Sequence, residues 1–259
     1  MQPNPPLMSF QPLQNISIIL VRPQGAGNMG SVSRAMKNMG FHRLILVQPG
    51  QDPLSPEARM MATSAKDILE NASIFPCLEG ALKDFRWIAG TSARKGRTRG
   101  PFTSLREICL EIVVHARDVP VAVLFGPEDR GLTNRELDPC QAFISIPTHP
   151  GLPSLNLAQA VMLVCYELRM ADLLGQGDES KAGLLTKPAE FRTIEAMYGQ
   201  MEELLLRIGF LDPQNPKRIM HTLRRIFGRA NLGDRDVAIL RGIFRQMDWY
   251  ATHGEKPSP

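Results

Sequence analysis

The first residues that could bind a ligand form a glycine-rich run, which follows a short apolar segment. Residues 25–30 read Gly-Ala-Gly-Asn-Met-Gly and match the GxGxxG pattern of dinucleotide-binding proteins. There the glycines permit a tight turn and let the backbone approach a pyrophosphate at a helix N-terminus. Two features argue against this interpretation. Gln48-Pro49 stands where an acidic residue should bind the ribose hydroxyls, and Arg22-Pro23-Gln24 lengthens the loop before the first glycine.

Three further segments carry side chains that suit binding and group transfer. The pattern N-x-G-x-x-x-R covers residues 28–34, G-x-E-x-x-G-L covers residues 126–132, and Ser-Leu-Asn stands at residues 154–156. Each is placed where a parallel sheet binds its ligands, at the carboxyl ends of the strands. These segments are the strongest candidates for a functional site.

Other catalytic arrangements are absent from the sequence. The five histidines are dispersed, and none stands at metal-ligand spacing from another histidine or a cysteine. The chain also lacks the GxSxG nucleophile elbow and the GxxxxGK(S/T) phosphate loop. We therefore predict no bound metal.

The elements that must position these segments alternate between strand and helix patterns. The expected strands are Ile16–Val21, Leu44–Val47, Trp87–Gly90, Val121–Phe125 and Phe143–Ile146. The expected helices are Ser31–Met39, Glu57–Leu69, Leu105–Ala116 and Leu155–Leu174. Strands separated by helices predict an α/β fold with a mainly parallel, helix-covered sheet.

A second, smaller unit is expected after this one. Residues 175–188 have the composition of a linker. Three helical segments follow, at residues 188–208, after Asn215-Pro216 and from Asp234. In the middle helix one apolar stripe is formed by Ile219, Met220, Leu223, Ile226 and Phe227. We expect a tail at residues 1–14, an α/β domain at 15–175, a linker at 176–188, a helical domain at 189–253 and a tail at 254–259.

The positive charge of the chain is concentrated in its last third. Residues 1–180 carry 17 basic and 17 acidic side chains, whereas residues 181–259 carry 13 basic and 9 acidic ones. This asymmetry suggests a polyanionic partner, of which nucleic acid is the commonest. A solvated basic helix face is the alternative explanation.

Composition limits the class of protein further. The chain has 259 residues, of which 43% are hydrophobic and 22% charged, so it is not a disordered protein. No apolar run approaches the ~20 residues of a membrane helix, and residues 1–12 do not resemble a secretory signal. The four cysteines form no CxxC pair, which is typical of reduced thiols. We predict a cytoplasmic protein without a membrane partner.

Together the three segments resemble the motifs of the SPOUT superfamily of RNA methyltransferases, in its TrmH branch. Gly90-Thr91-Ser92-Ala93-Arg94 and the basic C-terminal helices are similar to the TrmJ group within that branch. The resemblance covers roughly residues 15–248. It implies a parallel sheet with a C-terminal trefoil knot, an S-adenosylmethionine cofactor and a homodimer. It also implies methylation of the ribose 2′-hydroxyl of cytidine or uridine at tRNA anticodon-loop position 32.

The resemblance also implies roles for individual residues near the cofactor. Gly126 would let the backbone come close to it, as only glycine permits in a crowded loop. The other residues implied to bind S-adenosylmethionine are Thr91, Ser92, Ala93, Ile146, Ser154, Leu155 and Asn156.

Four residues are implied to serve catalysis. Arg34 is the main candidate, with Asn28 positioning it, Ser154 near the target ribose and Glu128 ordering its loop. A guanidinium has a pKa above ~12 and is a poor base. We therefore interpret Arg34 first as a clamp on a phosphate that also stabilises the developing alkoxide. The general-base role proposed for the family is the alternative.

Two groups of cations are expected to bind RNA. One follows the third expected strand and the other lies in the C-terminal helices. The predicted RNA-binding residues are Arg94, Lys95, Arg97, Arg218, Arg224, Arg225 and Arg229. The phosphate contacts of such residues should dominate affinity.

Three alternatives to a tRNA methyltransferase remain at this stage. A related enzyme could act on ribosomal RNA, because the three core motifs are shared across the branch. The fold could instead carry a non-catalytic RNA-binding protein, or the glycine-rich run could belong to a nicotinamide-dependent oxidoreductase.

Overall fold

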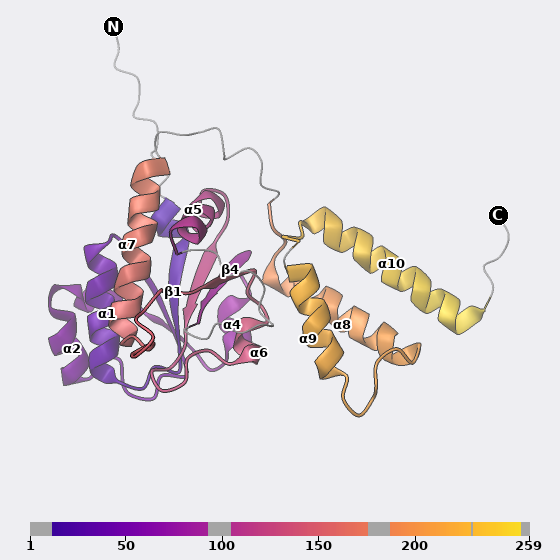
Figure 1. The fold of residues 1–259 in the computed structure, drawn as a ribbon, viewed down its shortest axis with the longest axis horizontal. Helices are drawn as coiled ribbons and strands as arrows, with labels where there is room; N and C mark the ends of the chain where they lie inside the picture. Colours follow the sequence, from indigo (N-terminus) through magenta and orange to yellow (C-terminus); the bar gives the residue numbers. More distant parts are fainter. Residues whose placement is uncertain (1–11, 93–104, 176–186, 229, 255–259) are drawn as a thin grey trace, which may run out of the picture.

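A computed structural model describes residues 12–92, 105–175, 187–228 and 230–254 of the chain. The described residues form an α/β unit and, after it, a group of helices that extends to one side (Figure 1). This arrangement agrees with the predicted α/β fold followed by C-terminal helices.

One parallel sheet organises the α/β unit. Its strands are β1 (Ile16–Val21), β2 (Arg43–Val47), β3 (Ser73–Phe75), β4 (Trp87–Thr91), β5 (Val121–Phe125) and β6 (Ala142–Ile144). Their order is β3-β2-β1-β5-β4-β6, and all pairings between the described strands are parallel. After β3 the chain crosses to the other side of β1. The carboxyl ends of β1 and β5 therefore flank a switch point, where α/β sheets bind ligands.

The five predicted strands are present, and the sequence missed β3. This edge strand has three residues and pairs only with β2. Its first two residues, Ser73 and Ile74, are exposed, so it lacks the apolar run that marks a buried strand.

Helices cover both faces of the sheet. The helices of the α/β unit are α1 (Ala26–Asn38), α2 (Pro56–Ala62), α3 (Lys66–Glu70), α4 (Leu78–Leu82), α5 (Leu105–Ala116), α6 (Asn134–Leu137) and α7 (Leu157–Gly175). Short 3₁₀ helices stand at Pro12–Asn15 (η1) and Thr63–Ala65 (η2). Helix α7 packs against α1 and α5 on one face, while α4 and α6 lie on the other.

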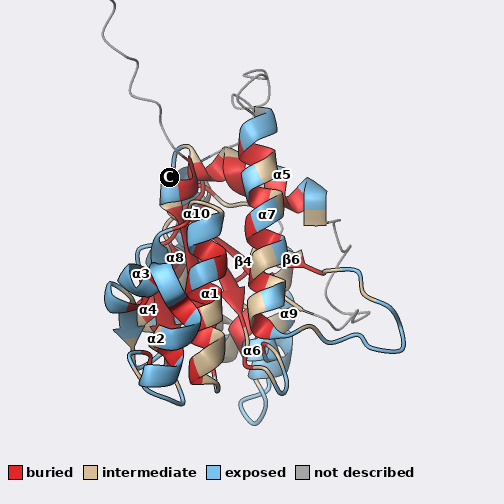
Figure 2. Ribbon diagram, turned by 90° about the vertical axis from the view of Figure 1, so that its left-hand side faces the viewer, coloured by how far each residue is buried: buried red, intermediate tan, exposed pale blue. Residues whose placement is uncertain are grey.

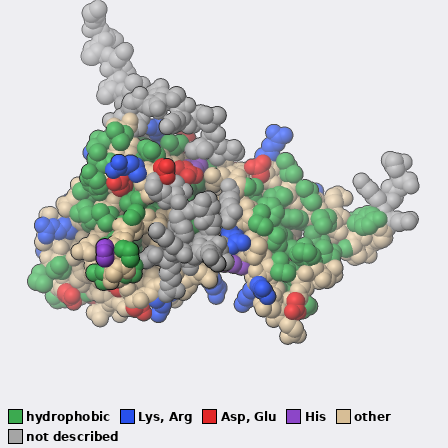
Figure 3. Space-filling view, in the orientation of Figure 1, with side chains coloured by type: hydrophobic (Ala, Val, Ile, Leu, Met, Phe, Trp, Pro, Cys, Tyr) green, Lys and Arg blue, Asp and Glu red, His purple; other side chains and the backbone are tan. Residues whose placement is uncertain are grey.

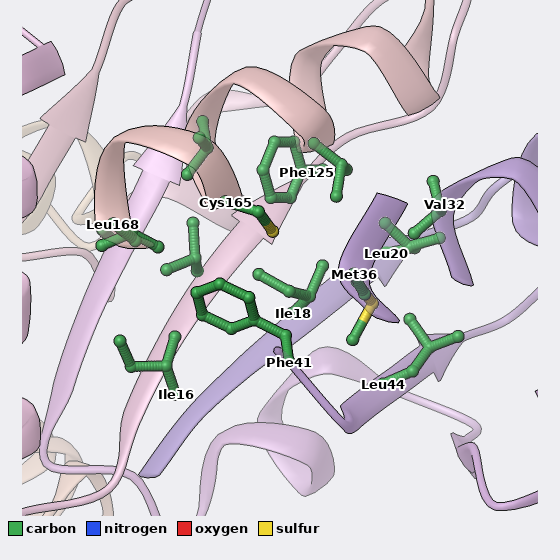
Figure 4. Close-up of a cluster of buried hydrophobic side chains, with 14 of the residues drawn as sticks. Ile16, Ile18, Leu20, Val32, Met36, Phe41, Leu44, Phe125, Cys165 and Leu168 are labelled. Carbon is green, nitrogen blue, oxygen red and sulfur yellow. The ribbon is translucent and has the colours of Figure 1, made fainter. Parts of the chain in front are cut away.

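Successive side chains of β1 point to opposite faces of the sheet and so pack against both helix layers. Ile16, Ile18 and Leu20 enter the larger hydrophobic cluster, whereas Ile19 and Val21 enter the cluster on the opposite face. Figure 4 shows the larger cluster, in which Phe41, Phe125 and Leu168 come from distant parts of the chain. All six residues of β1 are buried, which explains why its sequence is apolar throughout.

The glycine-rich run lies inside helix α1 and not in a loop before it. Only Gly25 precedes the helix, as its N-cap. A Cβ on Gly30 would stand 2.1 Å from the carbonyl oxygen of Ala58 in α2. Gly30 is thus required for the close packing of α1 on α2.

Several predicted boundaries differ from the structure. The expected helix Ser31–Met39 begins at Ala26. The expected helix Glu57–Leu69 is divided into α2, η2 and α3, because Thr63 adopts a left-handed conformation with φ of 51°. Residues 12–14, which were expected in the tail, belong to η1, and Leu13 is buried against the core.

The C-terminal helices are α8 (Phe191–Arg207), α9 (Lys217–Gly228) and α10 (Asp234–His253). They surround a separate cluster that includes Met197, Met201, Met220 and Val237. Part of the stripe predicted for α9 stays outside this cluster, because Ile219 and Ile226 are exposed. Figure 2 shows the contrast between the buried sheet and the more exposed helix surfaces.

The helical unit is held to the α/β unit at one end of α8. Phe191 enters the hydrophobic cluster beside α4 and α6, and its N–H donates to the carbonyl of Phe85 (3.0 Å). Arg86 donates to the Pro188 carbonyl (3.0 Å) and pairs with Glu190 (2.9 Å) and Asp234 (3.3 Å). These contacts place α9 and α6 close enough for an ion pair between His221 and Asp138 (2.5 Å).

Replacing Gly30 tests the packing of α1 on α2. We expect Gly30→Ala to lower the free energy of unfolding by roughly 1–3 kcal/mol, because the methyl group overpacks the contact with Ala58. Chemical denaturation measures this change. The matched control is Gly199→Ala in α8, where a Cβ meets no atom within 4 Å. An equal loss in both variants would contradict the packing argument.

Candidate active site

A pocket of about 330 Å³ opens at the carboxyl ends of β4, β5 and β6. Its volume lies in the range of small-molecule sites, roughly 300–1,000 Å³. Its lining comprises Thr91, Ser92, Phe125, Gly126, Pro127, Glu128, Asp129, Arg130, Gly131, Leu132, Ile144, Ile146, Thr148, Pro153, Ser154, Leu155, Leu157 and Ala160. The second and third sequence motifs therefore contribute to one cavity.

Most of the predicted cofactor-binding residues line this pocket. They are Thr91, Ser92, Gly126, Ile146, Ser154 and Leu155. Ala93 lies outside the described residues, and Asn156 stands beside the pocket without lining it. Sequence reasoning missed the apolar contributions of Ile144 and Leu132 and the participation of Thr148. The position of residues 147–153 directly after a strand end was the available signal for Thr148.

The loop between β5 and α6 is folded tightly on itself. The N–H of Gly131 donates to the carbonyl of Pro127 (2.9 Å), and Gly131 adopts a left-handed conformation with φ of 67°. A Cβ on Gly126 would stand 2.2 Å from the backbone of Gly131 and Leu132. This close approach requires glycine at position 126 and gives the pocket a wall made largely of backbone.

The Glu128 carboxylate joins this loop to the start of α1. One oxygen accepts the N–H of Gln24 (2.9 Å), and the other accepts the N–H of Gly25 (3.2 Å) and the Asn28 side-chain amide (2.8 Å). Helix α1 has no acidic residue in its first turn, and Gly25 supplies no side-chain cap. Glu128 therefore provides the negative charge that favours a helix N-terminus from a remote part of the chain.

Asn28 and Asn156 extend this connection to the third motif. The Asn156 amide donates to Oδ1 of Asn28 (2.9 Å). The Asn156 oxygen accepts the N–H of Ala158 (2.9 Å) at the start of α7. Glu128, Asn28 and Asn156 thus form one hydrogen-bonded chain that links all three sequence motifs. Asn28 does not contact Arg34, so its observed partners differ from the predicted positioning role.

The environment of Glu128 favours its ionised form. Burial raises the pKa of the carboxyl group, but the hydrogen bonds from Asn28, Gln24 and Gly25 outweigh this effect and hold the pKa below its usual range. The carboxylate is therefore charged at neutral pH and accepts all three hydrogen bonds.

Arg34 lies on α1 away from the pocket. It is six residues after Asn28, which corresponds to about 9 Å along the helix axis. Its side chain is exposed and does not line the cavity. Among the described residues it has no hydrogen bond or ion pair. The Arg34 guanidinium is therefore a cation on the exposed surface of α1.

The predicted RNA-binding residues have different surroundings. Arg94, Lys95, Arg97 and Arg229 lie outside the described residues. Arg218 is exposed on α9, and Arg225 is half-buried there.

Arg224 is engaged inside the helical unit. Its guanidinium forms a bidentate ion pair with Glu195 of α8 and lies over the ring of Tyr198, 4.4 Å from the centroid. The described contacts of Arg224 hold α9 against α8, and its role in RNA binding stays a prediction.

The described part of the chain has neither a cluster of metal-ligating side chains nor a helix that could span a membrane. No group of three or more His, Cys, Asp or Glu side chains is placed to hold a metal ion. No helix within those residues is long and apolar enough to cross a bilayer.

The depressed pKa of Glu128 predicts a pH-dependent contribution to stability. A carboxyl group with a lowered folded-state pKa stabilises the fold above its usual value of 4.5, and this contribution is lost as the pH falls through the folded-state pKa. We expect Glu128→Gln to lower stability at pH 7 and to reduce the further loss below about pH 4.5. Denaturant titrations at both pH values measure this. The control is Glu70→Gln, which removes an exposed ion pair with Arg59. The same pH response in both variants would contradict the assignment.

Comparisons with known proteins identify the family of the chain. Residues 15–166 match the SpoU rRNA Methylase family, and residues 192–257 match the C-terminal domain of the tRNA methyltransferase TrmJ. The tRNA (cytidine/uridine-2′-O-)-methyltransferase TrmJ of Cronobacter sakazakii is 41% identical over 252 residues, covering 95% of this chain and all of that protein.

Two further relatives extend the comparison. The tRNA (cytidine/uridine/adenosine-2′-O-)-methyltransferase TrmJ of Pseudomonas aeruginosa is 40% identical and covers 90% of this chain and 94% of its own. The crystal structure of TrmJ from Z. mobilis has a TM-score of 0.77 at 32% identity, covering 90% of this chain and 98% of that one. These matches confirm the resemblance inferred from the three motifs and the C-terminal helices. The chain belongs to the SpoU methylase family, in its TrmJ group.

Proposed function

We propose that this protein transfers a methyl group from S-adenosylmethionine to the ribose 2′-hydroxyl of cytidine or uridine at anticodon-loop position 32 of tRNA. The observation that carries the proposal is the hydrogen-bonded chain of Glu128, Asn28 and Asn156 beside a pocket of about 330 Å³. The relatives named as tRNA methyltransferases supply the substrate class. A tRNA substrate also favours a cytoplasmic location.

The pocket fits the proposed cofactor in size and in the chemistry of its lining. Ile144, Ile146 and Leu155 offer apolar surface to an adenine ring, while Thr91, Ser154 and the backbone beside Gly126 offer polar groups. When bound, S-adenosylmethionine supplies an activated methyl group on a sulfonium centre. The trefoil knot implied by the resemblance remains a prediction for the segment that enters α7.

The residues of the chain would contribute mainly by placement. Methyl transfer is an in-line displacement, and orientation of the reactants can supply about 7–11 kcal/mol of the barrier. We call the part of the β5–α6 loop that lines the cavity, residues 126–132, the pocket loop. The hydrogen bonds of Glu128, Asn28 and Asn156 hold the pocket loop, α1 and α7 in one arrangement. Ser154 lies at the pocket wall, where it can face the target ribose. Arg34 would bind the phosphate of the target nucleotide and stabilise the developing alkoxide.

We further propose that the enzyme works as a homodimer in which Arg34 serves the pocket of the partner subunit. Two observations support this. Arg34 is exposed on α1 outside its own pocket. Helix α7 also exposes several large apolar side chains, and Figure 3 shows hydrophobic side chains gathered over this part of the α/β unit. The large apolar side chains that α7 exposes are Leu163, Tyr166, Leu173 and Leu174. Such a patch is typical of a protein interface.

A ribosomal RNA substrate is the second candidate. The family matched by residues 15–166 is described as an rRNA methylase family, and the α/β unit alone does not separate the two substrates. The match of residues 192–257 to the TrmJ C-terminal domain favours tRNA.

Nucleoside mass spectrometry tests the proposed reaction. Unmodified tRNA transcripts are incubated with the protein and S-adenosylmethionine, and the modified nucleotide is located by nuclease mapping. We expect a 2′-O-methylated nucleoside at position 32. Arg34→Ala should reduce its rate of formation at least about a hundredfold, because a contact to the developing charge is lost. Methylation of ribosomal RNA alone would overturn the tRNA assignment.

A mixture of two inactive variants tests whether Arg34 acts in the pocket of the partner subunit. Arg34→Ala and Gly126→Val are each expected to be inactive, since the valine side chain would collide with Gly131. A refolded mixture should regain activity if Arg34 acts across the interface, because one pocket of the mixed dimer then has both wild-type parts. No recovery from mixed dimers would contradict action across the interface.

Two of the arginines of α9, Arg218 and Arg224, give a separate prediction for tRNA binding. We expect Arg218→Glu to weaken tRNA binding about threefold or more and to lower the slope of the salt dependence by about one, as for a phosphate contact. Arg224→Gln should instead lower the melting temperature, because it breaks the pair with Glu195. Filter binding at several salt concentrations and thermal denaturation separate the two effects. The affinity of both variants for S-adenosylmethionine should equal that of the wild type.

A further inference from the structure

Arg22 connects the end of β1 to the helix that follows the pocket loop. It is the first residue after β1, and its N–H donates to the carbonyl of Val47 (2.7 Å). Its guanidinium lies 2.5 Å from Oε1 of Glu136, on α6. Arg22 adopts a left-handed conformation with φ of 50°, which is costly for a residue other than glycine. A costly backbone conformation is retained here together with a specific side-chain contact.

Glu136 is a nearly buried carboxylate with a second task. Its side chain is only 9% exposed. Its other oxygen accepts the backbone N–H of Thr133 (2.8 Å) and the Thr133 hydroxyl (2.9 Å). The Thr133 Oγ1 in turn accepts the N–H of Glu136 (3.4 Å), which completes the capping box of α6. Burial alone would raise the pKa of Glu136, but Arg22 and Thr133 outweigh it and lower the pKa. Arg22 therefore compensates the negative charge of Glu136, which also accepts hydrogen bonds from Thr133 just after the pocket loop.

The segment after β1 thus holds the pocket loop at two places. The N–H groups of Gln24 and Gly25 bind Glu128 near its start, and the side chain of Arg22 binds Glu136 just after its end. Residues 126–132 between these points form a continuous part of the pocket lining. Movement at either attachment would displace the same backbone wall of the cavity.

We infer that Arg22 is a positioning residue for the cofactor, which sets the affinity for S-adenosylmethionine by fixing the pocket loop through Glu136 and Thr133. The inference rests on the proposed cofactor and concerns a residue outside the three motifs. Arg22 and Glu136 do not line the pocket themselves. Their effect must therefore pass through the geometry of the loop.

Isothermal titration calorimetry with S-adenosylmethionine tests the inference directly. We expect Arg22→Gln and Glu136→Gln each to raise the dissociation constant about tenfold, because either change releases the same attachment. The double variant should bind about as weakly as each single variant, since contacting residues do not add independently. It also removes both charges, so it leaves no uncompensated carboxylate and provides a folded reference. Arg22→Lys should bind within about threefold of the wild type, because it retains the positive charge.

Steady-state kinetics distinguish positioning from a purely structural role. The KM for S-adenosylmethionine should rise in Arg22→Gln, while kcat at saturating cofactor and tRNA stays within about twofold. The matched control is Arg59→Gln, which removes an arginine from the 2.9 Å pair with Glu70 on the outer side of α2 and α3. Its cofactor affinity should not change.

The outcomes separate this inference from the proposed function. Failure of the wild type to bind S-adenosylmethionine would overturn the cofactor assignment and, with it, the inference. Normal binding by the wild type with an unchanged dissociation constant in Arg22→Gln and in the double variant would overturn the inference alone. A lower melting temperature without a change in affinity would assign Arg22 a structural role only.

Discussion

The Glu128 carboxylate accepts hydrogen bonds from three donors that lie 100 to 104 residues away in the sequence. Its position on the pocket loop brings the start of α1 to the wall of the cavity. Asn28 also accepts a hydrogen bond from Asn156, which precedes α7. A charged acceptor makes these hydrogen bonds stronger than neutral ones. The site therefore depends on one ionised group whose burial is compensated by the elements that it holds together.

The sheet explains why these elements meet. The chain builds β1, β2 and β3 on one side and then returns to place β5 and β4 on the other. The loops after β1 and β5 consequently lie side by side at the switch point. Glycine at positions 126 and 30 permits two close approaches of backbone, one within the pocket loop and one between α1 and α2. The first shapes the cavity, and the second supports the helix whose N-terminus binds Glu128.

The helical unit adds charge to this framework and shares its core through Phe191. It has its own hydrophobic cluster and reaches the α/β unit through Phe191, Arg86 and the pair of His221 with Asp138. Arg224 and Arg218 of α9 differ in their surroundings. Arg224 lies against Tyr198 and Glu195 and holds α9 in place, whereas Arg218 faces solvent. A basic helix can therefore stabilise its own packing with one part of its charge and present another part to a polyanion.

The sequence by itself determined the α/β class, five of the strands and the three motifs. Buried strands need continuous apolar runs, and local patterns record this requirement. It could not show that close packing requires glycine at position 30, because the contact is with Ala58 of α2. Nor could it separate Arg224 from Arg218, since Glu195 lies on another helix. The edge strand β3 and the attachment of Arg22 to Glu136 likewise depend on neighbours that are distant in the chain. Sequence patterns indicate which side chains each segment buries. The contacts of a charged side chain or a glycine are made by residues distant in the chain, so they follow from the tertiary structure alone.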